Sequence, residues 1–506
     1  MEEKHMEKSI YQQIADHISD GVLDAGFSLP EEAGNSPLRF APGAFDGLCV
    51  YHMGHSELDA DAAKQMAAAL GTAAKGDCSG ADTLFYEWTK EHRTVSYIDD
   101  LQNYVLDHAK ELDPENVYRA ALSMVLDSEH IECVKVGLAL LELFGEPEED
   151  LKEIIRCLGL YDEFTIFSVW NMQKWENGNQ EIFSLAQKTH SWGRIHAVER
   201  LKPETDEIRH WLLTEGTVND VVNAYSSLTC WQKAGAEEIL FGHPTREEFT
   251  GIITLMEGLL DEGPVPGISQ LENAESILLK VLELMPEYSP DIDEYEVILS
   301  VREWAEDVNL SSVSRASDRI LHSPSCTSAV EKAVKEGSGL DLAEKLNIPF
   351  RDQLLAFMRR DFDRSYYNVR YLMKDPDCVD SVLRLFHEKL PLAEMKGEPV
   401  DDPCMGEEYK DYDKLQFLIQ ELEDKPLTGT EFIKAALESP APRNRYRALA
   451  VLKAWVQAKG TALSALLPEI YEEVLLLRNR EKKEDYFKMM DPLLEGRIEF
   501  PDEYDG

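Results

Sequence analysis

A short pattern recurs about every thirty residues in the first half of the chain and constrains the fold more than any other feature. It consists of a small residue, an apolar residue directly after it and another apolar residue four positions after it. The successive steps are 31, 29, 30 and 31 residues, and only the fifth copy lacks the final apolar residue. A small residue lets a neighbouring helix approach closely, and the apolar pair fills the layer between helices. The small residues are Gly137, Ser168, Ala197, Ser227 and Gly258.

Each copy of the pattern lies in one amphipathic segment and is followed by another. Residues 191–201 carry apolar side chains at helical spacing and end before Pro203. Two helices per period of about thirty residues are typical of an α-solenoid, in which helix pairs stack on one another. The segments expected to form the second helices are residues 148–158, 179–187, 205–215 and 236–241.

The unit around Ala197 resembles the short bacterial type of HEAT repeat. That motif has an arginine three residues before the small residue and a leucine seven residues after the arginine, as in Arg194, Ala197 and Leu201. The other units match its apolar positions but lack the arginine, while the full spacing returns 251 residues later, from Arg445. The resemblance implies an all-α fold, a HEAT-like α-solenoid of helix pairs, and it implies a shape rather than an activity.

Residues 26–54 interrupt the helical pattern, because prolines and glycines are concentrated there. Residues 38–40 and 48–52 read as short strands, the second opened by the turn signal Asp46-Gly47. We therefore expect a small α+β module at the N-terminus. The predicted division is residues 1–78 for this module, 79–262 for HEAT-like repeats, 263–395 for a helical middle section, 396–492 for C-terminal HEAT-like pairs and 493–506 for an acidic tail.

The charge balance narrows the classes of partner. The chain has 96 acidic and 51 basic residues, a formal net charge of -45, which disfavours nucleic acids and anionic membranes and favours basic partners or simple solubility. No stretch has the length and apolar character of a membrane span, and no secretory signal opens the chain. The eight cysteines are scattered without a Cys-x-x-Cys pair, as expected of reduced thiols in a cytoplasmic protein.

The predicted partner-binding residues lie on two of the second helices. The HEAT resemblance implies that second helices line the concave surface of the solenoid. Carboxylates in their first turns also stabilise the helix dipole, and tryptophan is more often a core residue than a partner anchor. The residues proposed to bind a basic partner are Asp206, Glu207, Arg209, His210, Trp211, Glu237 and Glu238.

The sequence suggests one possible metal site, formed by Cys49, His52 and His55, whose residue types can bind a metal and lie at close spacing. In a strand, Cys49 and His52 would point to opposite faces, so a turn at Met53-Gly54 would be needed to gather the three ligands. The chain contains none of the common hydrolase, kinase, zinc-protease or nucleotide-binding motifs. No cofactor is predicted.

The leading hypothesis is a cytosolic interaction scaffold whose acidic concave surface binds a basic protein or segment. One alternative is a protein that neutralises a basic toxin or nuclease. Another is an enzyme or metal-binding protein with its site in residues 26–61. The sequence favours a protein without enzymatic activity and leaves its oligomeric state open.

Overall fold

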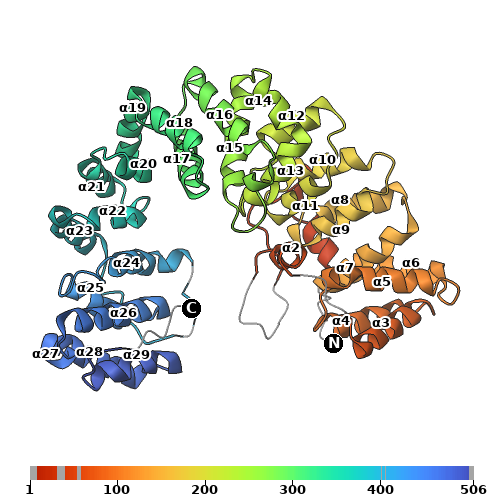
Figure 1. Ribbon diagram of the computed structural model, residues 1–506. Coiled ribbons are helices and arrows are strands. Elements are labelled where there is room, and N and C mark those ends of the chain that lie inside the picture. The colour runs from red at the N-terminus through yellow and green to blue at the C-terminus, as the bar shows by residue number, and fades with distance from the viewer. Residues whose placement is uncertain (1–7, 31–39, 54–57, 401, 405, 501–506) are drawn as a thin grey trace. The chain divides into compact units, whose positions relative to one another are not determined.

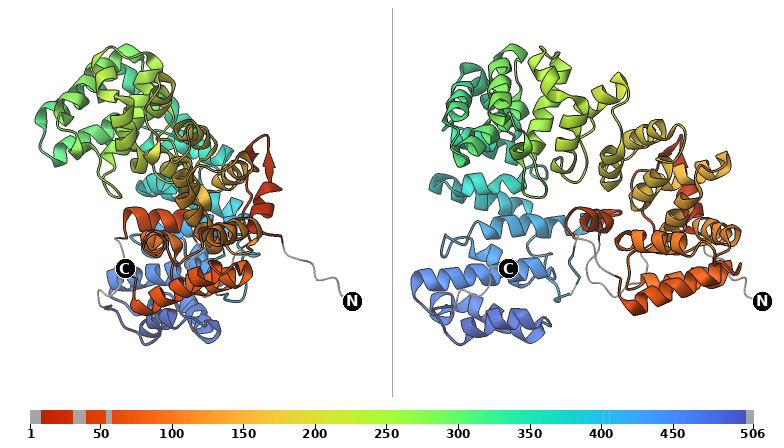
Figure 2. Two further views of the ribbon diagram at one scale, coloured as in Figure 1. Left: turned by 90° about the vertical axis from the view of Figure 1, so that its right-hand side faces the viewer. Right: turned by 45° about the vertical axis from the view of Figure 1, so that its right-hand side comes forward.

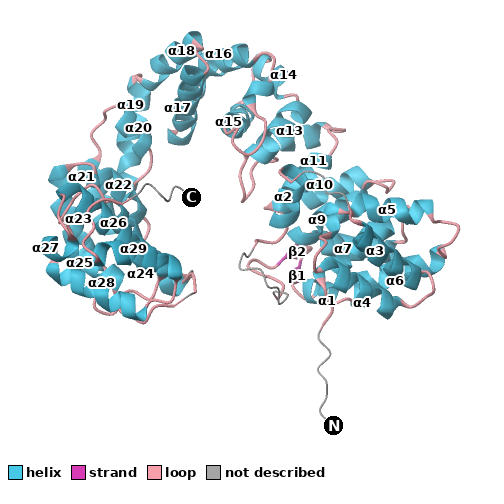
Figure 3. Cartoon of the chain, turned by 60° about the horizontal axis from the view of Figure 1, so that its bottom comes forward, coloured by secondary structure: helices cyan, strands magenta, loops and turns pink. Residues whose placement is uncertain are grey.

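The computed structural model describes residues 8–30, 40–53, 58–400, 402–404 and 406–500. These residues form 29 α-helices, short 3₁₀ helices and one two-stranded antiparallel sheet (Figures 1 and 3). The prediction of an all-α fold is therefore confirmed. The chain divides into two compact units: unit 1 comprises Met1–Pro290 and Val297–Asp318, and unit 2 comprises Asp291–Glu296 and Arg319–Gly506. The five-part division expected from the sequence stays a prediction.

The elements of unit 1 follow one another with short connections. The N-terminal elements are α1 (Ile10–Ala15), β1 (Ile18–Ser19), β2 (Val22–Leu23), α2 (Ala44–Tyr51), α3 (Ala60–Ala73), α4 (Cys78–Thr89), η1 (Thr94–Ser96), α5 (Ile98–Asp107) and α6 (Pro114–Asp127). Next come α7 (Ile131–Leu141), η2 (Glu142–Phe144), α8 (Glu149–Gly159), α9 (Asp162–Met172), α10 (Gly178–Lys188), α11 (Trp192–Arg200), α12 (Asp206–Thr214), α13 (Ala224–Ala234), α14 (Ala236–Phe241) and α15 (Arg246–Leu260). The last are η3 (Ile268–Gln270), α16 (Ala274–Leu284), η4 (Met285–Tyr288), α17 (Ile292–Asp307) and α18 (Ser311–Leu321). The first residues of α17 and the last residues of α18 belong to unit 2.

The predicted strand over residues 48–52 is wrong, because residues 48–51 belong to helix α2 and His52 is its C-cap. Helical spacing places Asp46, Gly47 and Cys49 in the interior, and a Cβ on Gly47 would lie 2.1 Å from the Trp192 ring. Tertiary packing thus overrides the local strand preference. The other predicted strand, residues 38–40, lies mostly outside the described residues.

The only strands among the described residues form a hairpin, β1–β2, that the sequence analysis missed. Ile18 pairs with Leu23 and Ser19 with Val22, so the connection is the two-residue turn Asp20-Gly21. Both turn residues have positive φ, 53° and 73°. This is the chemistry of a tight hairpin, in which Asp-Gly adopts two left-handed conformations at little cost. The same dipeptide at Asp46-Gly47, which predicts a turn there, lies inside helix α2.

Helices α7, α9, α11, α13 and α15 form one continuous row in unit 1, each contacting the next (Figure 1). Helices α8, α10, α12 and α14 form a second row beside it, and each packs against the following helix of the first row. The four predicted second helices are confirmed to within about two residues, and α14 matches its expected bounds. Unit 1 therefore contains the helix-pair stack of an α-solenoid.

The recurring small residues are enclosed where the helices meet. Ser168, Ala197 and Ser227 are at most 1% exposed, and Gly137 and Gly258 are buried. A Cβ on Gly258 in α15 would lie 2.0 Å from the Ser227 Oγ in α13, so these two residues pack directly on each other between neighbouring repeats. The thirty-residue pattern thus marks a seam of close helix contact.

The two arginines of the HEAT-like motif have equivalent roles in the two units. Arg194 donates hydrogen bonds to the Thr189 carbonyl (2.7 Å), just before its own helix, and to the Val218 carbonyl (2.9 Å), before the next helix of the row. Arg445 likewise donates to the Ser439 carbonyl (3.1 Å) before its own helix. It also binds the buried Glu481 carboxylate (2.8 Å), in the loop before the next helix of its row. Each arginine joins the loops of consecutive repeats.

Unit 2 continues the helix-pair design, with its helices stacked in layers (Figures 1 and 2). Helices α22, α24, α26 and α29 contact one another in that order, while α25 contacts α24, α26 and α28. The elements are α19 (Pro324–Ala333), η5 (Val334–Glu336), α20 (Leu340–Lys345), α21 (Arg351–Arg360), η6 (Tyr366–Asn368), α22 (Val369–Met373), α23 (Pro376–Lys389), η7 (Glu407–Tyr409), α24 (Lys410–Gln420), α25 (Thr430–Leu437), α26 (Pro442–Lys459), α27 (Leu463–Leu466), α28 (Pro468–Arg480) and α29 (Glu484–Leu494).

None of the described helices is long and apolar enough to cross a lipid bilayer.

Candidate functional site

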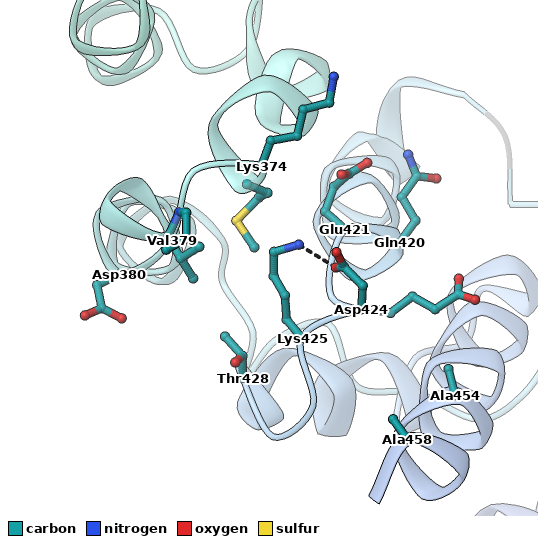
Figure 4. A pocket seen from close by; sticks show the side chains of 13 residues that line it. Lys374, Val379, Asp380, Gln420, Glu421, Asp424, Lys425, Thr428, Ala454 and Ala458 are labelled. Carbon is teal, nitrogen blue, oxygen red and sulfur yellow. Dashed lines mark hydrogen bonds and ion pairs between the residues drawn. The ribbon is translucent and has the colours of Figure 1, made fainter.

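An open cleft in unit 2 has a volume of about 1000 Å³. Helices α22 and α23 form one side, the end of α24 and the loop after it form the other, and α26 contributes residues from its last turns. Figure 4 shows Asp380 on the α23 side, Glu421 and Asp424 on the α24 side, and Ala454 and Ala458 on α26. The cleft therefore lies between consecutive helix pairs of the stack.

Carboxylates outnumber cations around this cleft. Its two lysines are already paired: Lys374 Nζ lies 2.7 Å from a Glu344 carboxylate oxygen, and Lys425 Nζ lies 2.5 Å from Asp424 (Figure 4). The remaining acidic residues, Asp380, Glu421 and Glu423, make no ion pair with any described residue. We call these three residues the cleft carboxylates.

Burial raises the pKa of Glu421 above its usual value, and attraction by Lys425 offsets this only in part. The charged form is therefore poorly solvated, and a further cation beside it would be stabilising. The same cleft has an apolar part, which includes Met373, Val379 and the two alanines of α26. An apolar surface beside free carboxylates suits a lysine or arginine side chain, whose stem is apolar and whose head is charged.

The predicted partner-binding residues of unit 1 lie on α12 and α14 and mostly face solvent. Asp206, Glu207, His210 and Glu238 are exposed, and Glu237 is half-buried. Several already have partners, because Asp206 pairs with Arg209, His210 lies 3.6 Å from Glu247, and Glu237 accepts a hydrogen bond from Asn273. Their role in binding stays a prediction.

Trp211 requires a correction, because it is a core residue and not part of an accessible surface. It is 6% exposed, its ring packs edge-on against Phe183 at a centroid distance of 5.5 Å, and Arg194 lies over it. Its apolar spacing in α12 places it against the neighbouring repeat, so the core interpretation of tryptophan holds here.

A buried ionic cluster in unit 1 was not predicted. Lys135 in α7 is fully buried, and its Nζ lies 2.8 Å from Asp46 in α2, 2.9 Å from Glu132 in α7 and 2.7 Å from Glu163 in α9. Arg93 also pairs with Glu132 at 3.0 Å. We call these five residues the Lys135 cluster. It joins the N-terminal segment to two helices of the first row.

The Lys135 cluster contains three carboxylates but only two cations, so its charges do not balance. This imbalance affects the pKa values of its members. Burial raises the pKa of Asp46 to about 7 despite the attraction of Lys135. Lys135 Nζ contacts one Asp46 oxygen at 2.8 Å, and no described donor reaches the other oxygen. Glu132 is equally buried, but Lys135 and Arg93 lower its pKa to about 2. Burial alone would lower the pKa of Lys135, but the three carboxylates raise it well above its usual value.

The described residues contain one group of three carboxylates close enough to hold a metal ion: Asp46, Glu132 and Glu163, whose ligand atoms lie within 4.8 Å of one another. The ammonium group of Lys135 contacts all three and supplies the central positive charge that a metal would supply. The arrangement is therefore a structural ion cluster. Its sequence signal is weak, since it consists of one lysine within the apolar run of α7.

The predicted metal ligands make other contacts. The Cys49 thiol faces the Met53 sulfur (3.8 Å) and the Ser96 hydroxyl (3.7 Å), while His52 Nε2 lies 2.7 Å from the Tyr225 hydroxyl on α13. His55 lies outside the described residues. Metal binding by these residues stays a prediction.

No protein family model, curated protein or solved structure compared with the chain matches it. Its class is therefore defined by the fold itself: an all-α solenoid of helix pairs, with an acidic cleft between two of them.

Proposed function

We propose that the protein is a cytoplasmic scaffold that binds a basic protein segment, and that the cleft of unit 2 receives lysine or arginine side chains of that segment. The observation that carries the proposal is the group of cleft carboxylates, Asp380, Glu421 and Glu423, which make no direct ion pair with any described residue and lie beside apolar side chains. Extended recognition along a stack of repeats is the usual mode of binding by solenoids.

The overall charge supports the same partner class. A chain with a net charge of -45 attracts basic partners over long distances and raises their association rate. Charges that are already paired contribute little to affinity, whereas the cleft carboxylates make no direct ion pair with a described residue and gain from an incoming cation.

The first prediction compares two variants that each remove three negative charges. One carries Asp380→Asn, Glu421→Gln and Glu423→Gln in the cleft, and the matched control carries Asp206→Asn, Glu207→Gln and Glu238→Gln on α12 and α14. We expect the cleft variant to bind a fluorescein-labelled oligolysine peptide roughly tenfold more weakly than the wild type, because direct cation contacts are lost. Fluorescence anisotropy of the full-length protein gives the dissociation constants.

The control variant has the same net charge, so it reports the long-range attraction alone and should weaken binding much less. Equal weakening by the two variants would show that the peptide responds only to net charge and would refute the cleft as the binding site. Stronger weakening by the control would assign binding to α12 and α14 instead.

A further inference from the structure

A second cavity of unit 2, about 400 Å³ in volume, has the opposite charge character. It lies where the first turns of α26 and α29 meet α24. Arg443, Arg447 and Lys483 line it together with Tyr446 and Tyr486. Two prolines and a glutamine complete its described lining, which includes no carboxylate. We call this cavity the basic pocket.

The basic side chains of this pocket are only partly neutralised. Arg443 pairs with Asp413 and donates to the Cys404 carbonyl, while its Nε is buried without a hydrogen-bond partner among the described residues. The side chains of Arg447 and Lys483 make no ion pair with any described residue. In a chain with almost twice as many acidic as basic residues, cations without partners around one cavity indicate a site for an anion.

One helix N-terminus adds to the positive potential. Helix α26, of 18 residues, begins at Pro442 and has neither a capping side chain nor an acidic residue in its first turn. Its start carries the positive pole of the helix dipole and favours an anion beside it. Helix α29 does not add to this effect, because Glu484 and Asp485 lie in its first turn.

The aromatic side chains that line the basic pocket indicate which kind of organic group carries the anion. The ring of Tyr446 is 40% exposed and lies 5.9 Å, centroid to centroid, from the ring of Tyr486. Aromatic walls of this kind suit a planar or apolar organic group. The pocket is too small for a long polymer, and the acidic remainder of the chain repels polyanions.

We propose that the basic pocket binds a small phosphomonoester. Arg447 and Lys483 contact the phosphate dianion, and Tyr446 packs against the organic part. An arginine fork and a lysine point charge are suited to this group, because phosphate offers several acceptor oxygens around a double negative charge.

The test is isothermal titration calorimetry of the full-length protein with phenyl phosphate and with inorganic phosphate at fixed ionic strength. We expect saturable binding at one site, tighter for phenyl phosphate. The Arg447→Ala/Lys483→Ala double variant should weaken binding of phenyl phosphate at least roughly tenfold, since two charge-assisted contacts are lost. Lys482→Ala is the control for loss of a neighbouring positive charge, because Lys482 is exposed and does not line the pocket.

Tyr446→Ala provides an independent test at an exposed position. It should remove most of the preference for phenyl phosphate over inorganic phosphate while both still bind. Absence of saturable binding of both probes, or equal weakening in the Lys482→Ala control, would overturn the proposal. Inorganic phosphate binding as tightly as phenyl phosphate would assign the pocket to free phosphate and would also overturn it.

Discussion

At the scale of single residues, Lys135 decides how the N-terminal segment is attached to the helix rows. It is one of two charges in an otherwise apolar helix, and its partners on other helices lie 89 residues before it and 28 residues after it. Local sequence patterns could not reveal the cluster, because a lysine in an apolar run is recognisable only as an exception. The three carboxylates become close only when α2, α7 and α9 are packed together.

The second prediction contrasts the two ends of one ion pair. Lys135→Met leaves three buried carboxylates without their shared cation, so we expect the free energy of unfolding to fall by about 3 kcal/mol or more at pH 8. Asp46→Asn removes the excess negative charge, so it should lower the free energy of unfolding far less at the same pH. Urea denaturation of the full-length protein measures both. Equal losses for the two variants would contradict the charge imbalance inferred for the cluster.

The third prediction concerns pH. The native pKa of Asp46 is about 7, above its ordinary value of 3.8, so this group stabilises the fold below pH 3.8 and loses that contribution as the pH rises through 7. Glu132, with a native pKa of about 2, acts in the opposite sense, but only below its ordinary value of 4.5. Between pH 5 and 8 the stability of the wild type relative to Asp46→Asn should therefore fall by about 2 kcal/mol. A constant difference across this range would rule out a raised pKa at Asp46.

At the scale of elements, the small-residue pattern predicted the helix pairs well. Its period reflects one physical requirement, close contact between neighbouring helices, which recurs in every repeat and so leaves a regular trace in the sequence. The wrong predictions of local structure concern segments that do not repeat along the chain. The residues Ser269-Gln270-Leu271-Glu272 have the sequence of a capping box, but Ser269 lies in a 3₁₀ turn. Its hydroxyl binds Glu262, and the helix begins only at Ala274.

The fourth prediction tests the seam between repeats with two glycine substitutions in helices. Gly258→Ala brings a methyl group into Ser227 and the Asn223 backbone, so we expect a loss of about 1–3 kcal/mol in the free energy of unfolding. Gly71→Ala, in α3, is the matched control, since no atom lies within 4 Å of the added carbon. Helix propensity alone should make the control more stable by about 0.5–1 kcal/mol.

Thermal or urea unfolding, followed by circular dichroism, compares the two variants with the wild type. A gain in stability for Gly258→Ala similar to that of the control would mean that the seam has room for a side chain, and close contact between repeats would not explain the recurrence of small residues.

At the scale of the whole molecule, the two units share a design but differ in charge. Unit 1 has 56 of the 96 acidic residues but only 23 of the 51 basic ones, so its net charge is much more negative than that of unit 2. The recurring small residues predicted a solenoid, and such charge totals suggested a basic partner as a hypothesis. The sequence could not locate the cleft, because the lining residues come from segments around 373–380, 420–428 and 454–458, which are adjacent only in the folded stack.

The most direct measurement of the central claim is hydrogen–deuterium exchange of the full-length protein with and without the oligolysine peptide. Occupation of the cleft predicts slower exchange on peptide binding in residues 373–380, 420–428 and 454–458, and little change in residues 206–214 and 236–241. Slower exchange in α12 and α14 alone, or no change in the three cleft segments while the peptide is bound, would contradict it.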